Sequence, residues 1–445
     1  MAALTHQCRR APRSLLVLAD FQVLLSRNPA LCLQSRNYAK ETRHSSQPKK
    51  QAAIKGWGKK MPEPAEGEQA TKRKKMTAFL PMPAGQLTHR VFKREGDLQL
   101  QDFHPEIITP AVASQALKFP HNSKDPFRIF GLPRNLLVEF RILSKPCSVV
   151  RGVTIDTVNR LDAAAQSPSA NHRLVFTGAT GCGKSVLLLQ SLQYCHARDW
   201  IVFYFPRAIS LVNSTTIYTY DPRTQTYLQP VFAYQTLQRC LTVNERRLQQ
   251  LRTQTKVEIE RRPAIPAGTL LTDLIKAGLK ERALAPTILA ALMDELSNQS
   301  SFPVLLAIDD FQAIYCKSAY RDPHFSSIRP YHLSMPRLLL EYASGEKTFA
   351  RGAVLGAISN TNTTFSLPLE LAEALNVPPT SPGGPYVKRS SLLQRYANGL
   401  ERIAVPDALN VQEAMEVFDV WARDRAIPPS AQLISSSVDW ASTDR

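Results

Sequence analysis

A glycine-rich run between residues 178 and 185 has residue types and spacing that suit the binding of a polyphosphate. Glycine lets the backbone approach an anion closely, so that its N–H groups converge on the phosphate oxygens. Lys184 can reach the β- and γ-phosphates, and the hydroxyl of Ser185 can ligate Mg²⁺. We therefore predict a nucleotide site at Gly178, Ala179, Thr180, Gly181, Cys182, Gly183, Lys184 and Ser185.

The elements on either side of this run support that interpretation. A β-prone stretch at 174–177 precedes the run, and a leucine-rich stretch of helical character follows it. The pattern G-x-x-x-x-G-K-S between a strand and a helix is the context that a phosphate-binding P-loop requires. The N-terminal end of the following helix attracts the same anion. The alternative is a glycine-rich turn that binds nothing.

Two carboxylates, Asp309 and Asp310, end an apolar run at residues 303–310 that has the pattern of a buried strand. We expect Asp309 to contact Mg²⁺, through a water molecule. Asp310 stands where ATPases of the additional-strand division usually carry a glutamate that activates the attacking water, so it is a weak candidate for a catalytic residue. Because aspartate is shorter, turnover would be slow or absent. The alternative is a pair of acids that cap the next helix.

Two further strands are predicted at 200–205 and 353–358, and Asn360 follows the second, where it is placed to sense the γ-phosphate. Strands that alternate with helices predict an α/β fold with a parallel sheet, helices on both faces and the ligand at the carboxyl ends of the strands. We expect a P-loop NTPase of the additional-strand division. Apolar positions at near-helical spacing in 410–425 predict a small C-terminal helical subdomain.

Two other segments have a readable pattern. Residues 217–230 predict a hairpin in which Tyr218, Tyr220 and Tyr227 share a face, and packing is the preferred role for these rings. Residues 245–262 are highly charged and predict a helix that is solvated or faces a partner. Neither segment adds a catalytic group.

The base of the nucleotide is not specified by a motif. Signal-transducing GTPases are disfavoured, because the chain contains no guanine-reading N-K-x-D and Asp309 is followed by Asp-Phe-Gln rather than by x-x-Gly. The motifs therefore leave the base open, and the expected cofactor is Mg²⁺ with GTP, GDP or ATP. The seven cysteines occur singly, so neither a disulfide framework nor a zinc module is predicted.

The positive charge of the chain is concentrated near its start. The formal net charge is +18, and residues 1–38 carry five arginines against one acid. This composition is typical of a mitochondrial transit peptide, and Arg36-Asn37-Tyr38-Ala39 resembles a matrix-processing site. We predict localisation in the mitochondrial matrix and a mature N-terminus at Ala39. The alternative is an ordinary basic tail.

Residues 39–126 are predicted to form a basic, largely disordered arm, whose clustered charges suit the phosphate backbone of RNA. The expected RNA contacts are Lys72, Arg73, Lys74 and Lys75. The alternatives are a solvated tail or a nuclear localisation signal, which the import signal upstream disfavours. We expect the nucleotide-binding core over 127–385 and a helical, lid-like subdomain and tail over 386–445. No apolar run approaches the roughly 20 residues of a membrane span, so none is expected.

Four segments, 145–161, 173–195, 199–208 and 226–244, resemble a known family. They are similar to the death-associated-protein family of mitochondrial small-subunit ribosomal proteins, and in particular to a fungal member. The resemblance covers about residues 127–425. It implies an AAA-like P-loop domain in the head of the mitochondrial small ribosomal subunit, holding a guanine or adenine nucleotide. It also implies contacts with small-subunit rRNA and neighbouring ribosomal proteins, and with bridges toward the large subunit.

We therefore expect a structural constituent of the mitochondrial small ribosomal subunit that holds a nucleotide, supports mitochondrial translation and is not an enzyme, apart from weak NTP hydrolysis. The alternative is a ribosome-independent mitochondrial AAA-type ATPase that remodels protein partners as a ring. Such a ring needs an arginine from the adjacent subunit, for which the candidates are Arg321, Arg329 and Arg351.

Overall fold

The computed structural model describes residues 98–120, 122, 124–259, 262–379, 387–424 and 426–427. The transit peptide predicted at 1–38, most of the basic arm and its four proposed RNA contacts lie outside these residues. The fold described below is that of the body of the chain.

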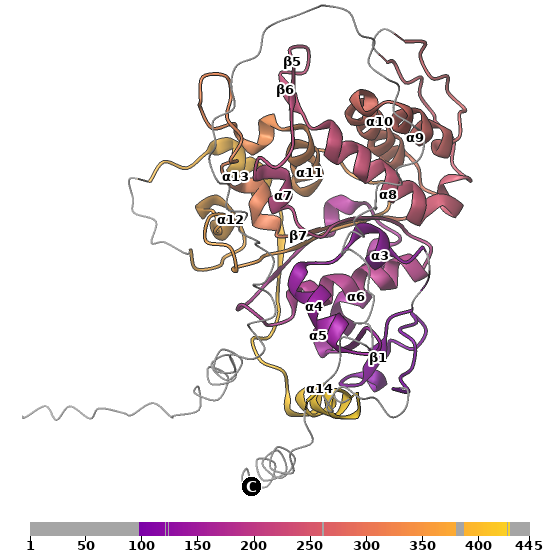
Figure 1. Ribbon diagram of the computed structural model, residues 1–445, viewed down its shortest axis with the longest axis vertical. Coiled ribbons are helices and arrows are strands. Elements are labelled where there is room, and N and C mark those ends of the chain that lie inside the picture. Colours follow the sequence, from indigo (N-terminus) through magenta and orange to yellow (C-terminus); the bar gives the residue numbers. More distant parts are fainter. Residues whose placement is uncertain are drawn as a thin grey trace, which may run out of the picture. The chain divides into compact units, whose positions relative to one another are not determined.

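A five-stranded parallel sheet forms the centre of the body (Figure 1). The strand order is β4-β7-β8-β3-β9, so β8 lies between the strand before the glycine-rich loop and the strand that ends in Asp309. The strands are β3 (Arg173–Thr177), β4 (Ile201–Phe205), β7 (Val304–Asp309), β8 (Gly352–Ala357) and β9 (Glu401–Ala404). The first four confirm the strands predicted from the sequence to within one residue at each end.

Helices cover both faces of the sheet, as the sequence predicts (Figure 1). Alternate strand residues point to opposite faces, so that Leu174 and Phe176 belong to one core and Val175 to the other. The helices on the first face are α3 (Pro126–Phe130), α4 (Arg134–Ile142), α5 (Gly152–Ala164) and α6 (Lys184–Ala197). Those on the second face are α7 (Ile209–Val212), α8 (Pro230–Leu248), α9 (Leu271–Lys280), α10 (Ala285–Asn298), α11 (Ser334–Ser344), α12 (Leu369–Ala374) and α13 (Ser391–Ala397).

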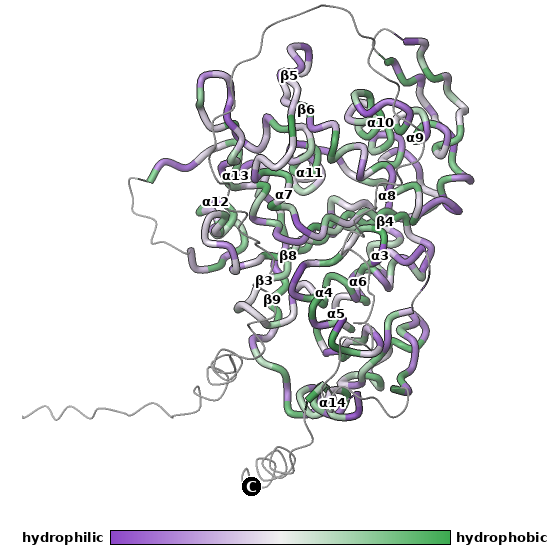
Figure 2. The backbone as a smooth tube through the Cα atoms, in the orientation of Figure 1, coloured by the Kyte–Doolittle hydropathy of each residue, from purple (hydrophilic) through white to green (hydrophobic). Residues whose placement is uncertain are grey.

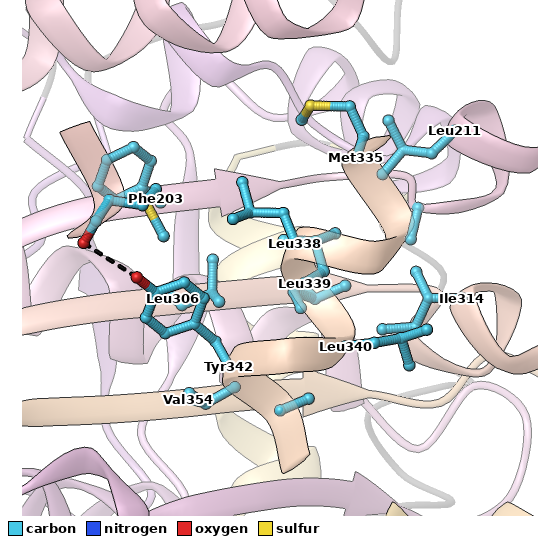
Figure 3. Close-up of a cluster of buried hydrophobic side chains, with 14 of the residues drawn as sticks. Phe203, Leu211, Leu306, Ile314, Met335, Leu338, Leu339, Leu340, Tyr342 and Val354 are labelled. Atoms are coloured by element: carbon cyan, nitrogen blue, oxygen red, sulfur yellow. Dashed lines mark hydrogen bonds between the residues drawn. The ribbon is translucent and has the colours of Figure 1, made fainter. Parts of the chain in front are cut away.

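The second face buries the larger core. Figure 3 shows Leu338 and Leu339 of α11 lying over strand residues Phe203 and Leu306. The hydroxyl of Tyr342 donates a hydrogen bond to the carbonyl oxygen of Met293, at 2.9 Å, and this bond ties α11 to α10. The strands themselves lie in a hydrophobic band of the backbone in Figure 2. This apolar packing holds the strand ends in fixed positions relative to one another.

Among the described residues, two small antiparallel pairs and five short 3₁₀ helices accompany the main sheet and its helices. The pairs are β1 (Ala116–Lys118) with β2 (Cys147–Val149), and β5 (Thr219–Asp221) with β6 (Thr226–Leu228). The 3₁₀ helices are Pro110–Val112, Ser169–Asn171, Arg282–Leu284, Phe311–Tyr315 and Pro330–His332. The β5–β6 pair is the hairpin predicted at 217–230, and its tyrosine rings pack together, with Tyr218 and Tyr227 centred 5.3 Å apart.

The sequence predicts a helical subdomain in the C-terminal region, but β9 lies within this region and joins the main sheet next to β3. The helix predicted at 410–425 is present as α14 (Val411–Arg423), but it packs beside β1 and β2. The segment predicted to form a separate lid-like subdomain therefore contains β9, which is part of the main sheet, and α14, which packs on the β1–β2 pair.

The prediction of a helix over 245–262 is wrong, because α8 ends at Leu248. The buried carboxylate of Glu295 accepts hydrogen bonds from the backbone N–H groups of Gln254, at 2.7 Å, and Thr255, at 3.0 Å. These bonds hold the chain in a non-helical course. Among the described residues, no helix is both long and apolar enough to span a membrane.

Candidate functional site

The glycine-rich loop joins β3 to α6 in a conformation that requires glycine. Gly178, Gly181 and Gly183 have φ values of 149°, 86° and 92°, in the region that residues with a Cβ atom rarely adopt. A Cβ atom on Gly178 would also lie 2.8 Å from the carbonyl oxygen of Val405 and 2.9 Å from Sγ of Cys182. The loop is therefore shaped by its glycines, as the sequence predicts.

Lys184 is the first residue of α6, and its side chain lies along the loop. Its ammonium group donates hydrogen bonds to the carbonyl oxygens of Gly178, at 2.9 Å, and Ala179, at 2.6 Å. The residue is only 6% exposed. A positive charge is thus held inside the loop, at the N-terminal end of a 14-residue helix, where an anion is favoured.

Ser185 and Asp309 come together although they are 124 residues apart in the chain. The hydroxyl of Ser185 donates a hydrogen bond to Oδ1 of Asp309 at 3.1 Å. The same oxygen accepts the backbone N–H of Asp310 at 3.0 Å, and Asp310 has a left-handed φ of 56°. The oxygen atoms of Ser185 and Asp309 therefore lie side by side next to Lys184. Oxygen atoms of this kind are the ligands that Mg²⁺ prefers.

Both aspartates have a raised pKa. Burial and, to a lesser extent, the charge of Asp310 raise the pKa of Asp309 to about 7, and the hydrogen bond from Ser185 opposes the rise. Burial also raises the pKa of Asp310, while a hydrogen bond with Ser359 and the charge of Arg207 oppose this. A carboxyl group that is costly to ionise alone is well suited to a bound cation, which would compensate its charge.

One cavity, of about 440 Å³, opens at the carboxyl ends of the strands. Ligand pockets in proteins have volumes of about 300–1,000 Å³, so this cavity is large enough for a small organic ligand. The predicted site residues that line it are Thr180, Gly181, Gly183, Lys184, Ser185, Asp309, Asp310 and Asn360. Gly178, Ala179 and Cys182 belong to the same loop but do not line the cavity, and Cys182 is buried.

Other cavity residues were not predicted from the sequence. They come from the start of α4, from the segment after β4 and from the loop after β8: Arg134, Asn135, Glu139, Arg207, Ser359, Thr361 and Asn362. A signal existed for Arg207 and Ser359, because each follows a predicted strand. No comparable signal existed for α4, since its position over the cavity depends on tertiary packing.

Arg151 was also not predicted, and it contacts the loop from outside the cavity. Its guanidinium group donates to the carbonyl oxygens of Cys182, at 2.7 Å, Pro406, at 3.1 Å, and Ala408, at 3.2 Å. Nearby, the backbone N–H of Ala179 donates to Oδ1 of Asp407 at 2.8 Å. The loop is thus braced by the segment that leads from β9 to α14.

The residues present fit a nucleotide phosphate with Mg²⁺. The left-handed glycines keep side chains out of the loop, Lys184 supplies a positive charge, and Ser185 and Asp309 supply adjacent oxygen ligands. Among the described residues there is no cluster of three or more His, Cys, Asp or Glu that could hold a metal on its own. Phosphate oxygens or water would therefore have to complete the coordination.

The fold and the site define a mixed α/β protein whose parallel strands end at a cavity bordered by a glycine-rich loop, a lysine and a carboxylate pair. The family model described as mitochondrial ribosomal death-associated protein 3 matches residues 148–438. The chain belongs to this family, as its resemblance at 145–244 predicts. Membership supports the mitochondrial location predicted from the sequence.

Curated relatives have the name small ribosomal subunit protein mS29. The Schizosaccharomyces pombe protein is 27% identical over 289 residues, which cover 62% of this chain and 60% of the relative. The Neurospora crassa protein is 30% identical over 237 residues, covering 52% and 50%, and the Bos taurus protein is 26% identical over 271 residues, covering 58% and 65%. The chain thus spans between half and two-thirds of these relatives. Their shared name is that of a ribosomal protein, in agreement with the expectation of a protein that is not an enzyme.

Proposed function

We propose that this chain is a structural protein of the mitochondrial small ribosomal subunit, and that its body binds a guanine or adenine nucleotide with Mg²⁺. The ribosomal part of the proposal is supported by membership of the family and by the shared name of the relatives. The proposal includes incorporation into the subunit head and support of mitochondrial translation, because the family resemblance of residues 127–425 implies both.

The nucleotide part is supported above all by one arrangement: Lys184 and the Ser185–Asp309 pair meet at a cavity beside a loop of left-handed glycines. The position of β8 between β3 and β7 supports a P-loop fold of the additional-strand division. In this proposal the loop N–H groups and Lys184 bind the β- and γ-phosphates. Ser185 and Asp309 hold Mg²⁺, which neutralises phosphate charge when bound.

The nucleotide acts as a structural ligand. A ligand that binds only the folded state stabilises it by about 3–4 kcal/mol when its concentration is 100 to 1,000 times its dissociation constant. Asp310 has a shorter side chain than the glutamate usual in ATPases of this division, which favours slow or absent hydrolysis. Asn360 lines the same cavity, and its proposed role is to contact the γ-phosphate.

The expected partners are small-subunit rRNA and neighbouring ribosomal proteins. The chain is also expected to contact bridges toward the large subunit. The proposed RNA contacts Lys72, Arg73, Lys74 and Lys75 lie outside the described residues. A ring-forming ATPase is less well supported, because two of its candidate arginines serve their own chain: Arg321 donates to the carbonyl oxygen of Phe325, and Arg351 to those of Ala165 and Ser300.

Sedimentation of mitochondrial lysate, with and without EDTA, tests this proposal. We expect the wild-type chain to sediment with the small subunit and to remain with it when EDTA separates the two subunits. Lys184→Ala should incorporate less well, and the exposed-site control Lys280→Ala should behave as wild type. A ribosome-free peak of hexamer size would contradict the ribosomal role and favour the ring ATPase. Normal incorporation of Lys184→Ala would contradict the role of the nucleotide in assembly.

A further inference from the structure

Arg207 lies beside the aspartate pair because of how its backbone is fixed. β4 pairs with β7 in parallel, with Phe205 opposite Ile308, so the chain leaves β4 where β7 reaches Asp309. The backbone N–H of Ala208 then donates to the carbonyl oxygen of Asp309 at 3.0 Å. The main chain on either side of Arg207 is therefore anchored next to the strand end that carries Asp309 and Asp310.

The side chain of Arg207 is exposed and lines the cavity together with Lys184, Ser185 and Asp310. Within the described part of the chain, Arg207 is not a member of any ion pair. A guanidinium group at the cavity wall thus has its hydrogen-bond donors available.

The charges of the cavity wall explain what this group could bind. The wall carries three cations, Arg134, Lys184 and Arg207, and three carboxylates, Glu139, Asp309 and Asp310. A divalent cation at Ser185 and Asp309 would offset much of the carboxylate charge and leave the cations for an anion. Of the two arginines, Arg207 is the one next to Ala208, whose backbone N–H is hydrogen-bonded to Asp309. That is the end of the site toward which Lys184 and Mg²⁺ direct a γ-phosphate.

We propose that Arg207 binds the terminal phosphate of a nucleoside triphosphate within its own chain, and thereby makes the site select triphosphate over diphosphate. The proposal rests on the nucleotide binding proposed above. The planar guanidinium group donates two parallel N–H groups to phosphate oxygens, which a lysine cannot do. No arginine from a neighbouring subunit is needed. A diphosphate lacks the group that Arg207 contacts, so its affinity does not depend on this residue.

Titration calorimetry on the full chain tests the assignment. The ligands are the β,γ-imido triphosphates of guanosine and adenosine, and the corresponding diphosphates, each with Mg²⁺. We expect Arg207→Gln to weaken triphosphate binding about 10- to 100-fold, since a hydrogen bond to a charged group is lost. Diphosphate binding should change less than about threefold. Arg207→Lys should lie between wild type and Arg207→Gln, because it keeps the charge and loses the fork.

The matched control is Arg246→Gln, an exposed arginine of α8 that is not part of the cavity wall. It should bind both ligands as wild type does. Equal weakening of tri- and diphosphate binding by Arg207→Gln, or unchanged binding of both, would overturn the assignment to the terminal phosphate while leaving nucleotide binding intact. A wild-type chain that binds neither nucleotide would instead overturn the proposed function, and the Arg207 assignment with it.

Discussion

Arg151 donates a hydrogen bond from Nη1 to the carbonyl oxygen of Cys182, at 2.7 Å, in the glycine-rich loop. Nε of the same guanidinium group lies 3.3 Å from Oε2 of Glu413, in the first turn of α14. The two side chains of this ion pair are only 11% and 6% exposed. One largely buried arginine therefore connects the proposed phosphate site to α14, the last helix among the described residues.

This connection predicts a large loss of stability in Arg151→Ala. The substitution would leave the buried carboxylate of Glu413 without its cation, and breaking a buried pair in this way costs about 3–5 kcal/mol. Equilibrium unfolding in urea measures the change. Arg160→Ala is the control, because Arg160 pairs with Glu401 on the surface, with both side chains more than 40% exposed, and such pairs contribute about 0–1 kcal/mol. The double variant Arg151→Ala/Glu413→Gln should recover part of the loss. Equal losses for Arg151→Ala and Arg160→Ala would refute the buried connection.

A second prediction compares two glycines near the site. Gly178→Ala should destabilise the body by about 1–3 kcal/mol, because a Cβ atom would meet the carbonyl oxygen of Val405 at 2.8 Å and the left-handed φ would be strained. Gly152, at the start of α5, has open space around a Cβ atom, so Gly152→Ala should be neutral or stabilising by up to about 1 kcal/mol. Thermal unfolding of the two variants distinguishes them, and a Gly178→Ala variant as stable as wild type would contradict the loop geometry.

Local patterns were sufficient to predict the centre of the fold. The strands that end at Thr177, Asp309 and Ala357 are short apolar runs bounded by polar or glycine residues, and each is predicted from that pattern. The loop and its lysine followed from a motif whose residue types are set by the chemistry of phosphate. These features depend on neighbours in the sequence, which is why they can be read without the structure.

The features that were missed depend on contacts between distant residues. β9 has one buried side chain, Ile403, so its sequence carries no alternation that predicts a strand. Arg151 meets its partners only because α5, the loop and the segment after β9 converge. The helix expected at 245–262 fails because Glu295, far along the chain, binds the backbone N–H groups of residues 254 and 255. Pairings of this kind require the tertiary fold.

A third prediction concerns the stabilising effect of a nucleotide. Addition of Mg²⁺ and a guanine or adenine triphosphate analogue should raise the thermal midpoint of the wild-type chain, by mass action on the folded state. Lys184→Ala should lose most of this rise, since the ammonium group held by the carbonyl oxygens of Gly178 and Ala179 is removed. Lys280→Ala, an exposed lysine at the end of α9, is the control and should keep it. Differential scanning calorimetry gives the result, and an undiminished rise in Lys184→Ala would count against the proposed phosphate contact.

A fourth prediction follows from the raised pKa of Asp309, which is about 7 because the carboxyl group is buried next to Asp310. Below pH 7 this group keeps its proton, and Mg²⁺ must displace the proton in order to bind. The apparent affinity for Mg²⁺ in the presence of nucleotide should therefore fall by up to about tenfold per pH unit below 7, and level off above it. Calorimetry at pH 6 and pH 8 measures this. Asp309→Asn should lose the pH dependence, whereas Asp294→Asn, at an exposed ion pair with Lys347, should retain it. Equal affinity at both pH values in the wild-type chain would contradict the assignment.

A fifth prediction concerns Asp125, which caps α3 by accepting the backbone N–H of Phe127 at 3.3 Å. Burial raises its pKa to about 7, with the Phe127 hydrogen bond and the charge of Arg128 opposing the rise, and Oδ2 has no hydrogen-bond partner. Because the folded state holds this proton more tightly than the unfolded chain, the stability contributed by the group decreases as pH rises from about 4 to about 7, and then stays low. Each pKa unit corresponds to about 1.4 kcal/mol, so the full decrease is at most about 4 kcal/mol.

Asp125→Asn keeps the capping oxygen and removes the titrating charge. The new amide N–H₂ group would be buried without a hydrogen-bond partner, which costs about 1–3 kcal/mol and offsets part of the gain in stability. Relative to wild type, the variant should therefore be about 1–2 kcal/mol more stable at pH 8 and less stable at pH 5. Urea unfolding at the two pH values gives the difference, from which the titration of Asp309 cancels because it is common to both chains. Asp156→Asn, at an exposed position of α5, should change stability by less than about 0.5 kcal/mol at either pH. A constant difference between Asp125→Asn and wild type across this range would mean that the Asp125 carboxyl group titrates at its ordinary pKa, and that the end of α3 is hydrated rather than buried.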